Sequence, residues 1–144
     1  MIQNTSLGNI PRQEYLNSGH NACPGCAASL SVRYLAKVMG ASSVFVITAS
    51  CWSIIAGPAP LRALNTTVMH SPFACAAATG SGLKRGLEML GDHETQVIVL
   101  AGDGGTFDIG LQALSAAAER NENILYVCYD NEAYMNTGMQ KSSA

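Results

Sequence analysis

A glycine-rich turn with a single aspartate, the Gly-Asp-Gly-Gly of residues 102–105, constrains the fold of this chain more than any other feature. It follows residues 95–100, a short apolar run with β-branched side chains that we expect to be a buried strand. Residues 109–120 then repeat apolar side chains at helical spacing, and residues 124–129 form a second buried strand. A strand, a helix and a strand in this order form a right-handed parallel unit. The sequence therefore predicts an α/β fold with a doubly wound parallel sheet.

Polar residues follow both of these strands. Asp103 and Asn131 lie 28 residues apart, and because the carboxyl ends of parallel strands meet at one sheet edge, we expect them to converge there. Their oxygens are hard donors that suit Mg²⁺, and the backbone carbonyl of Ala133 could add a further ligand. The glycines beside Asp103 let the backbone approach a diphosphate and offer N–H groups to it. The alternative is a tight βα turn followed by an ordinary Asx turn.

Composition and charge limit the classes of function. At 144 residues the chain is one domain or less, and 48% apolar against 12% charged residues suggests burial by partner subunits. The net charge of −2 and the lack of a basic run give no argument for nucleic acid. No apolar stretch reaches membrane-spanning length, and the first 20 residues are polar, so we expect a cytoplasmic protein.

The carboxyl end of the sequence predicts a longer polypeptide. Residues 142–144 follow a glycine-containing loop, and no element remains to cover the strand at 124–129. A doubly wound sheet needs further strands and helices. We therefore expect residues 1–144 to be the amino-terminal portion of one binding domain, truncated at its carboxyl end, with residues 1–26 as an amino-terminal segment.

The five cysteines favour a metal centre over disulfides, because their number is odd and no secretory signal is visible. Cys23 and Cys26 form a CxxC in a Pro/Gly turn, and Cys51 follows a strand-like apolar run at residues 44–48. A zinc or iron–sulfur site normally takes four ligands. Cys75 and Cys128 are more simply read as buried apolar thiols, so the fourth ligand is not obvious. Zinc and iron–sulfur stay equally open on this pattern.

Two further helices are expected from the hydrophobic pattern. Residues 73–90 are rich in Ala and Gly, and their small side chains permit close approach to a neighbouring element or subunit. Residues 27–39 form an amphipathic helix with Arg33 and Lys37 facing outward. The apolar side chains expected to face inward on this helix are Leu30, Tyr34, Leu35 and Val38.

Four stretches together resemble the β subunit of the 2-oxoacid:ferredoxin oxidoreductases, the pyruvate synthase family. They are residues 19–26, 49–51, 101–110 and 126–138, and they run in the family's order and spacing over nearly the whole chain. Gly-Asp-Gly followed after one crossover by Asn is similar to the thiamine diphosphate signature. The resemblance implies a thiamine diphosphate-binding fold.

The resemblance also implies which residues bind the cofactor. Asp103, Asn131 and the Ala133 carbonyl would bind Mg²⁺, while the glycine-rich turn and the loop after Asn131 would line the diphosphate. No catalytic residue is assigned. The implied cofactor-binding residues are Cys51, Gly102, Asp103, Gly104, Gly105, Asn131, Glu132, Ala133, Tyr134, Met135 and Asn136.

By the same resemblance, Cys23, Cys26 and Cys51 are three ligands of a [4Fe–4S] cluster next to the thiamine. The family's fourth cysteine lies downstream, beyond Ala144. Residues 51–58 differ from the corresponding segment of pyruvate enzymes, which weakens the substrate assignment and not the cofactor assignment.

The implied activity is the oxidative decarboxylation of a 2-oxoacid, foremost pyruvate, to acyl-CoA and CO₂. Thiamine holds the electron pair that remains when CO₂ leaves, and a neighbouring cluster can pass electrons singly to ferredoxin. The implied partners are the 2-oxoacid, coenzyme A, ferredoxin and the α-, γ- and δ-type subunits of one complex, without nucleic acid or membrane.

Two alternatives stay open. A cluster-free thiamine decarboxylase or synthase would keep Asp103 and Asn131 but leave the three loop cysteines without a role. A non-catalytic zinc- or nucleotide-binding module would bind zinc and no thiamine. Residues 102–107 lack the GxGxxG spacing of dinucleotide-binding turns, so the nucleotide version is weak.

Overall fold

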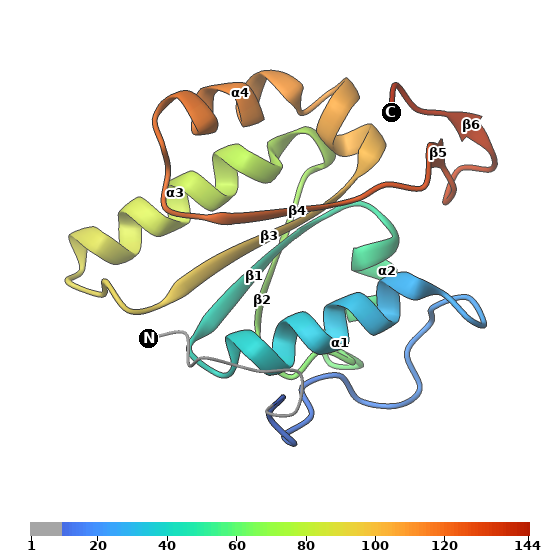
Figure 1. Cartoon of the computed structure of the whole chain (residues 1–144), viewed down its shortest axis with the longest axis horizontal. Coiled ribbons are helices and arrows are strands. Elements are labelled where there is room, and N and C mark those ends of the chain that lie inside the picture. Colours follow the sequence, from blue (N-terminus) through green and yellow to red (C-terminus); the bar gives the residue numbers. More distant parts are fainter. Residues whose placement is uncertain (1–9) are drawn as a thin grey trace.

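Within residues 10–144, four strands run parallel in one sheet, in the order β2, β1, β3, β4 (Figure 1). The computed structural model describes residues 10–144, so the first nine residues of the expected segment 1–26 lie outside the described residues. The strands are β1 (Ser43–Thr48), β2 (Thr67–Ser71), β3 (Gln96–Gly102) and β4 (Leu125–Tyr129).

Helices cover both faces of the sheet. α1 (Ala27–Met39) and α2 (Cys51–Ala56) lie on one face, and α3 (Ala76–Met89) and α4 (Leu111–Glu119) lie on the other (Figure 1). This two-sided cover confirms the predicted α/β fold with a parallel sheet. Among the described residues, the helices are all too short or too polar to cross a membrane.

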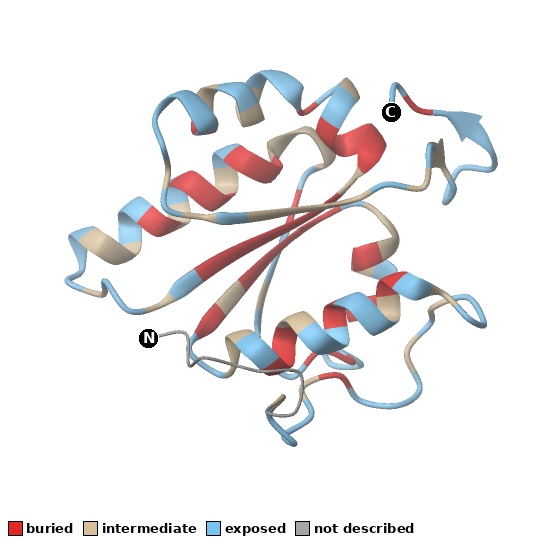
Figure 2. Ribbon diagram, viewed as in Figure 1, coloured by how far each residue is buried: buried red, intermediate tan, exposed pale blue. Residues whose placement is uncertain are grey.

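The two central strands form the core because their side chains are apolar on both faces. Phe45 and Ile47 of β1 face α1 and α2, while Val46 and the β3 residue Val99 face α3. Figure 2 shows the buried residues gathered on β1, on β3 and on the inner sides of the helices. Strands buried on both faces read as continuous apolar runs, which is why the sequence reveals them.

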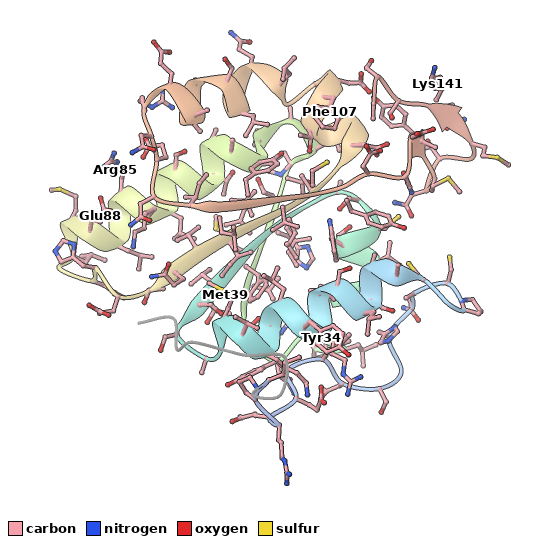
Figure 3. All side chains as sticks on the ribbon, in the orientation of Figure 1. Tyr34, Met39, Arg85, Glu88, Phe107 and Lys141 are labelled. Carbon is pink, nitrogen blue, oxygen red and sulfur yellow. The ribbon has the colours of Figure 1, made fainter. Side chains whose placement is uncertain are left out.

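The expected inward face of α1 is wrong in part. Leu30, Tyr34 and Val38 are 48%, 44% and 44% exposed. Tyr34 projects from the outer side of the helix (Figure 3). The residues that pack on the sheet are smaller ones one turn apart, Ala28, Val32 and Ala36, together with the half-buried Leu35. Small side chains let the helix axis approach the sheet closely, so residue size rather than hydrophobicity alone selects the inner face.

Lys37, expected to face outward, is also buried. Its ammonium lies 2.6 Å from a carboxylate oxygen of Glu14 and 3.3 Å from the carbonyl of Pro11. The amino-terminal segment therefore covers this side chain and supplies its partners.

The close approach expected of the Ala- and Gly-rich helix is confirmed on its sheet side. A Cβ atom on Gly80 of α3 would collide with the side chain of Val99 in β3. The helix is shorter than expected, because residues 73–75 form a separate 3-10 turn, η1 (Phe73–Cys75).

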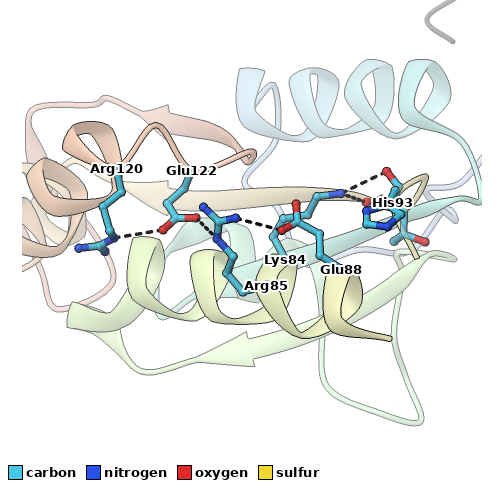
Figure 4. Close-up of polar contacts among 7 residues, drawn as sticks. Lys84, Arg85, Glu88, His93, Arg120 and Glu122 are labelled. Carbon is cyan, nitrogen blue, oxygen red and sulfur yellow. Dashed lines mark hydrogen bonds and ion pairs between the residues drawn. The ribbon is translucent and has the colours of Figure 1, made fainter. Parts of the chain in front are cut away.

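Polar side chains hold the far end of α3 (Figure 4). The buried Lys84 donates hydrogen bonds to the backbone carbonyls of Thr95, at 3.0 Å, and His93, at 3.5 Å. The Glu122 carboxylate, only 5% exposed, lies between Arg85 at 2.9 Å and Arg120 at 3.1 Å. These contacts join α3 to the segments that enter β3 and β4.

Three short elements at the carboxyl edge of the sheet were not predicted. η2 (Gly104–Asp108) is a π-helical turn directly after β3, and β5 (Ala133–Tyr134) pairs antiparallel with β6 (Gln140–Lys141) after β4. The edge strand β2 was also missed, since its sequence Thr-Val-Met-His-Ser mixes polar and apolar side chains. These elements shape the region around Asp103 and Asn131.

Glu14 makes stability depend on pH. Its hydrogen bonds with Arg33 and then Lys37 lower the pKa of its carboxyl from 4.5 to about 2. Because the folded pKa lies below the unfolded one, this contribution is complete above about pH 4.5 and is lost as the pH falls towards about 2. We expect Glu14→Gln to flatten that part of the stability profile measured by urea denaturation. An unchanged acid slope in the variant would contradict this ion-pair assignment.

Candidate functional site

A cavity of about 340 Å³ opens at the carboxyl edge of the sheet, among the segments that follow β1, β3 and β4. The chain leaves β1 towards β2 on one side and leaves β3 towards β4 on the other. Such a switch point leaves a crevice between diverging loops, where open α/β folds bind ligands. The site residues predicted from the sequence that line this cavity are Cys51, Gly102, Asp103, Gly104, Gly105, Asn131, Ala133, Tyr134, Met135 and Asn136.

Glu132 is the predicted cofactor-binding residue that does not line the cavity. It occupies a turn with φ of 58°, in the left-handed region, and its backbone N–H donates to the Asp130 carboxylate at 3.0 Å. The turn at Glu132 leads into β5, whose residues Ala133 and Tyr134 do line the cavity.

Asp103 and Asn131 converge on this cavity, as the crossover between their strands predicts. The Asp103 side chain is 3% exposed, and its Oδ2 accepts a hydrogen bond from the Ser142 hydroxyl at 2.7 Å. The Asn131 Oδ1 accepts from the backbone N–H of Ala133 at 3.3 Å. This bond from Ala133 to Asn131 forms an Asx turn, the alternative named in the sequence analysis. The Asx turn and the convergence of Asp103 and Asn131 on the cavity are therefore both present.

Aromatic rings press on the glycines after β3. A Cβ atom on Gly104 would lie 2.5 Å from the ring of Tyr134, and one on Gly105 would lie 3.1 Å from the ring of Phe73. The Tyr134 hydroxyl also bonds to the Asp108 carboxylate at the end of η2. A side chain on Gly104 would require the Tyr134 ring to move, and one on Gly105 would require a small shift of Phe73, so the packing favours glycine at both positions.

The three loop cysteines lie at or just before the first turns of α1 and α2. Cys26 is the N-cap of α1, Cys51 is the first residue of α2, and Cys23 is exposed in the preceding turn. Burial raises the pKa of the Cys51 thiol, a hydrogen bond from Asn136 opposes this, and the Cys26 and Cys23 thiols raise it further. Within residues 10–144, no three His, Cys, Asp or Glu side chains are arranged to hold a metal ion. The thiols of the described residues therefore do not form a closed metal site in this structure.

The remaining two cysteines lie away from this group. Cys75 is the N-cap of α3 and Cys128 lies in β4, and both are half-buried rather than fully buried as expected. Burial raises the pKa of the Cys128 thiol. Neither lines the cavity.

Three aromatic residues of the site were missed by the sequence analysis: Phe73, Trp52 and Tyr129. Phe73 and Tyr129 line the cavity, and the buried Trp52 packs against Tyr129. The Trp52 indole N–H donates to the Ala101 carbonyl at 3.1 Å, and its ring packs edge-on against Tyr129 at 5.6 Å. These contacts join segments far apart in the chain, and no local pattern signals them.

Comparison with known proteins agrees with this geometry. Residues 48–144 match the family described as thiamine pyrophosphate enzyme, C-terminal TPP binding domain. Pyruvate synthase subunit PorB of Methanothermobacter thermautotrophicus is 49% identical over 135 residues, which are 94% of this chain and 47% of PorB. Ketoisovalerate oxidoreductase subunit VorB of Pyrococcus horikoshii is 50% identical over 140 residues, 94% of this chain and 45% of VorB. The chain thus spans about half the length of these curated relatives.

The fold also occurs in a solved structure, 2-oxoglutarate:ferredoxin oxidoreductase from Magnetococcus marinus with 2-oxoglutarate, coenzyme A and succinyl-CoA bound. The superposition has a TM-score of 0.71 at 24% identity and covers 98% of this chain and 46% of that one. The family predicted from the four sequence stretches is therefore confirmed. The chain belongs to the thiamine pyrophosphate enzymes, among the β subunits of the 2-oxoacid:ferredoxin oxidoreductases.

Proposed function

We propose that this chain is the thiamine-binding domain of an enzyme that oxidatively decarboxylates a 2-oxoacid to acyl-CoA and CO₂. Electrons pass through a [4Fe–4S] cluster to ferredoxin. The observation that carries this proposal is that one cavity is lined both by Asp103 and Asn131 and by Cys51. A candidate diphosphate anchor and a candidate cluster ligand thus line the same cavity. Pyruvate is the proposed substrate, and ketoisovalerate is the alternative, because the identity to VorB (50%) is nearly the same as that to PorB (49%).

The environment of Asp103 fits a bound Mg²⁺. A buried carboxylate is costly unless a cation or several donors compensate it. Among residues 10–144, no basic side chain forms an ion pair with Asp103. A divalent ion shared by Asp103, Asn131, the Ala133 carbonyl and a diphosphate would supply that compensation, with hard oxygen ligands of the kind Mg²⁺ prefers.

The three loop thiols fit a [4Fe–4S] cluster less completely than Asp103 fits Mg²⁺, because they supply only three ligands. Cys26 and Cys51 stand at the starts of α1 and α2, which cover the same face of the sheet, and this supports a common centre with Cys23. Such a cluster takes four thiolate ligands. We propose that the fourth comes from outside this sequence, as the family resemblance implies, and that the three thiols close around the cluster when it is inserted.

The residues of this chain would then act by binding and by excluding water. Bound thiamine diphosphate would supply the electron sink that the decarboxylation of a 2-oxoacid needs. Asp103 and Asn131 would fix the metal and the diphosphate. Ile54, Phe73 and Met135 line the cavity with apolar side chains, which would help to exclude water and strengthen electrostatic interactions once a cofactor fills it.

We propose a cytoplasmic complex in which coenzyme A, ferredoxin and α-, γ- and δ-type subunits are the partners. Exposed apolar side chains on α1 and at the end of α3 support the proposal of partner subunits, because such subunits would cover them. Leu30, Tyr34 and Val38 project from α1, and Met89 and Leu90 at the end of α3 are 87% and 86% exposed.

Cys51→Ala tests the proposed cluster. In the anaerobically purified complex, we expect iron rather than zinc by elemental analysis and visible absorbance that dithionite bleaches. The variant should lose this absorbance while retaining thiamine diphosphate, because Asp103 and Asn131 are unchanged. Cys75→Ala is the matched control: it removes a half-buried thiol that does not line the cavity, and it should leave the spectrum intact.

Two outcomes would contradict the proposal. A wild-type complex with full thiamine occupancy and no bleachable absorbance would indicate a cluster-free thiamine enzyme. Zinc in the complex together with no thiamine affinity would indicate a non-catalytic binding module.

A further inference from the structure

Ser142 is a buried polar residue in an otherwise exposed segment. It is 5% exposed, although Lys141 before it and Ser143 and Ala144 after it are all exposed. It directly follows β6 (Gln140–Lys141), the second strand of the short hairpin at the carboxyl edge of the sheet. A buried hydroxyl needs a hydrogen-bond partner, and the partner here is the proposed metal ligand Asp103.

The Ser142 hydroxyl donates its proton to Asp103. Its Oγ lies 2.7 Å from Oδ2 of Asp103, which is 39 residues away in the chain. The same Oγ accepts a hydrogen bond from the backbone N–H of Ala144 at 3.4 Å. Since a hydroxyl has one proton and an ionised carboxylate can only accept, that proton belongs to the bond with Asp103.

The backbone of Ser142 holds the neighbouring loop as well. Its N–H donates to the carbonyl of Glu132 at 3.2 Å, in the loop that follows β4. The antiparallel pairing of β5 with β6 returns the chain to this loop. Ser142 therefore joins the turn that carries Asp103 to the loop that carries Asn131.

A carboxylate held in this way suits a cation with strict geometry. The hydrogen bond engages Oδ2 of Asp103, which fixes the rotation of the side chain and so the direction in which Oδ1 is presented. Mg²⁺ demands near-ideal octahedral geometry with short bonds, whereas Ca²⁺ accepts longer bonds and a flexible set of ligands. A Mg²⁺ site therefore depends more on a fixed carboxylate than a Ca²⁺ site does.

We propose that Ser142 is a positioning residue that orients the Asp103 carboxylate and thereby sets the preference of the site for Mg²⁺ over Ca²⁺. This inference rests on the proposed function, because it assumes a divalent ion bound by Asp103, Asn131 and the Ala133 carbonyl. Ligating carboxylates are themselves hydrogen-bonded, and loss of such a partner typically weakens metal binding about 10–100-fold.

Ser142→Ala in the complete complex tests this inference, because it removes the hydroxyl and keeps the backbone bond to Glu132. Isothermal titration calorimetry of the cofactor-free complex, with excess thiamine diphosphate, measures the affinities for Mg²⁺ and for Ca²⁺ separately. We expect Mg²⁺ to bind about 10–100-fold more weakly in the variant. The affinity for Ca²⁺ should fall less, so the preference for Mg²⁺ should decrease.

Two variants serve as matched controls. Ser142→Thr keeps the hydroxyl and should retain the wild-type preference for Mg²⁺. Ser143→Ala makes the same chemical change at the next residue, which is exposed and does not line the cavity, so it should leave both affinities unchanged.

The outcomes separate this inference from the proposed function. Unchanged Mg²⁺ affinity in Ser142→Ala, or equal losses of Mg²⁺ and Ca²⁺ affinity, would overturn the inference alone, and so would the same loss in Ser142→Thr or Ser143→Ala. Tighter Mg²⁺ binding in Ser142→Ala would also overturn it, because the hydroxyl would then compete with the metal for the carboxylate. A wild-type complex that binds no thiamine diphosphate in the presence of Mg²⁺ would overturn the proposed function itself.

Discussion

Asp103→Ala should abolish the Mg²⁺-dependent binding of thiamine diphosphate. The carboxylate is 3% exposed at the end of β3, lines the cavity and has no basic partner among the described residues, so it is placed to bind the metal. Loss of an outer-shell partner alone typically weakens metal binding about 10–100-fold, so loss of a ligand should cost at least about 100-fold. Isothermal titration calorimetry with thiamine diphosphate, in Mg²⁺ and in a chelator, measures this effect.

Asp130→Asn is the control for this measurement. Asp130 lies at the same sheet edge and is exposed, and it does not line the cavity. The asparagine keeps an oxygen that can accept the hydrogen bond from Glu132. Its affinity should stay near wild type. Because Asp103→Ala also removes the acceptor of the Ser142 hydroxyl, a thermal melt must show that the variant is folded. Unchanged Mg²⁺-dependent affinity in folded Asp103→Ala would refute the metal assignment.

Gly110→Ala should strongly destabilise the protein. Gly110 is buried at the junction between η2 and α4, and a Cβ atom there would collide with the backbone carbonyl of Gly105. A backbone atom cannot move aside as a flexible side chain can. We expect the free energy of unfolding to fall by about 3 kcal/mol or more, at or beyond the upper end of overpacking effects. Urea denaturation gives this value, and displacement of η2 should weaken thiamine diphosphate binding as well.

Gly82→Ala supplies the contrast. Gly82 lies within α3, and a Cβ atom on it meets nothing within 4 Å. Alanine favours a helix interior by up to about 1 kcal/mol over glycine, so this variant should be as stable as wild type or slightly more stable. If Gly110→Ala unfolded at the same urea concentration as Gly82→Ala, the packing at the η2 junction would be misassigned.

Much of the fold follows from continuous apolar runs. The strands β1, β3 and β4 lie within two residues of their predicted bounds, because strands covered on both faces need apolar side chains throughout. α1 (Ala27–Met39) has its predicted bounds. The edge strand β2 and the π-helical η2 were missed, because an edge strand tolerates polar residues and Gly-Gly-Thr-Phe-Asp shows no helical period.

The convergence of Asp103 and Asn131 could be predicted because topology alone brings both strand ends to one edge. The aromatic residues that surround the site could not be predicted from the sequence. Trp52, Phe73 and Tyr129 come from three separate elements, and their contacts depend on the packing of α2 and η1 against the sheet. The prediction of the inner face of α1 was wrong for a related reason. How closely the helix packs on the sheet decides whether Val32 or Tyr34 faces inward.

The most direct test of the whole account is the structure of the complete complex, crystallised anaerobically with thiamine diphosphate and Mg²⁺. We predict the diphosphate in the cavity, with the metal bound by Asp103, Asn131 and the Ala133 carbonyl. We also predict anomalous scattering from iron between the sulfurs of Cys23, Cys26 and Cys51. Thiamine bound away from Asp103, or three sulfurs without iron beside bound thiamine, would contradict the account.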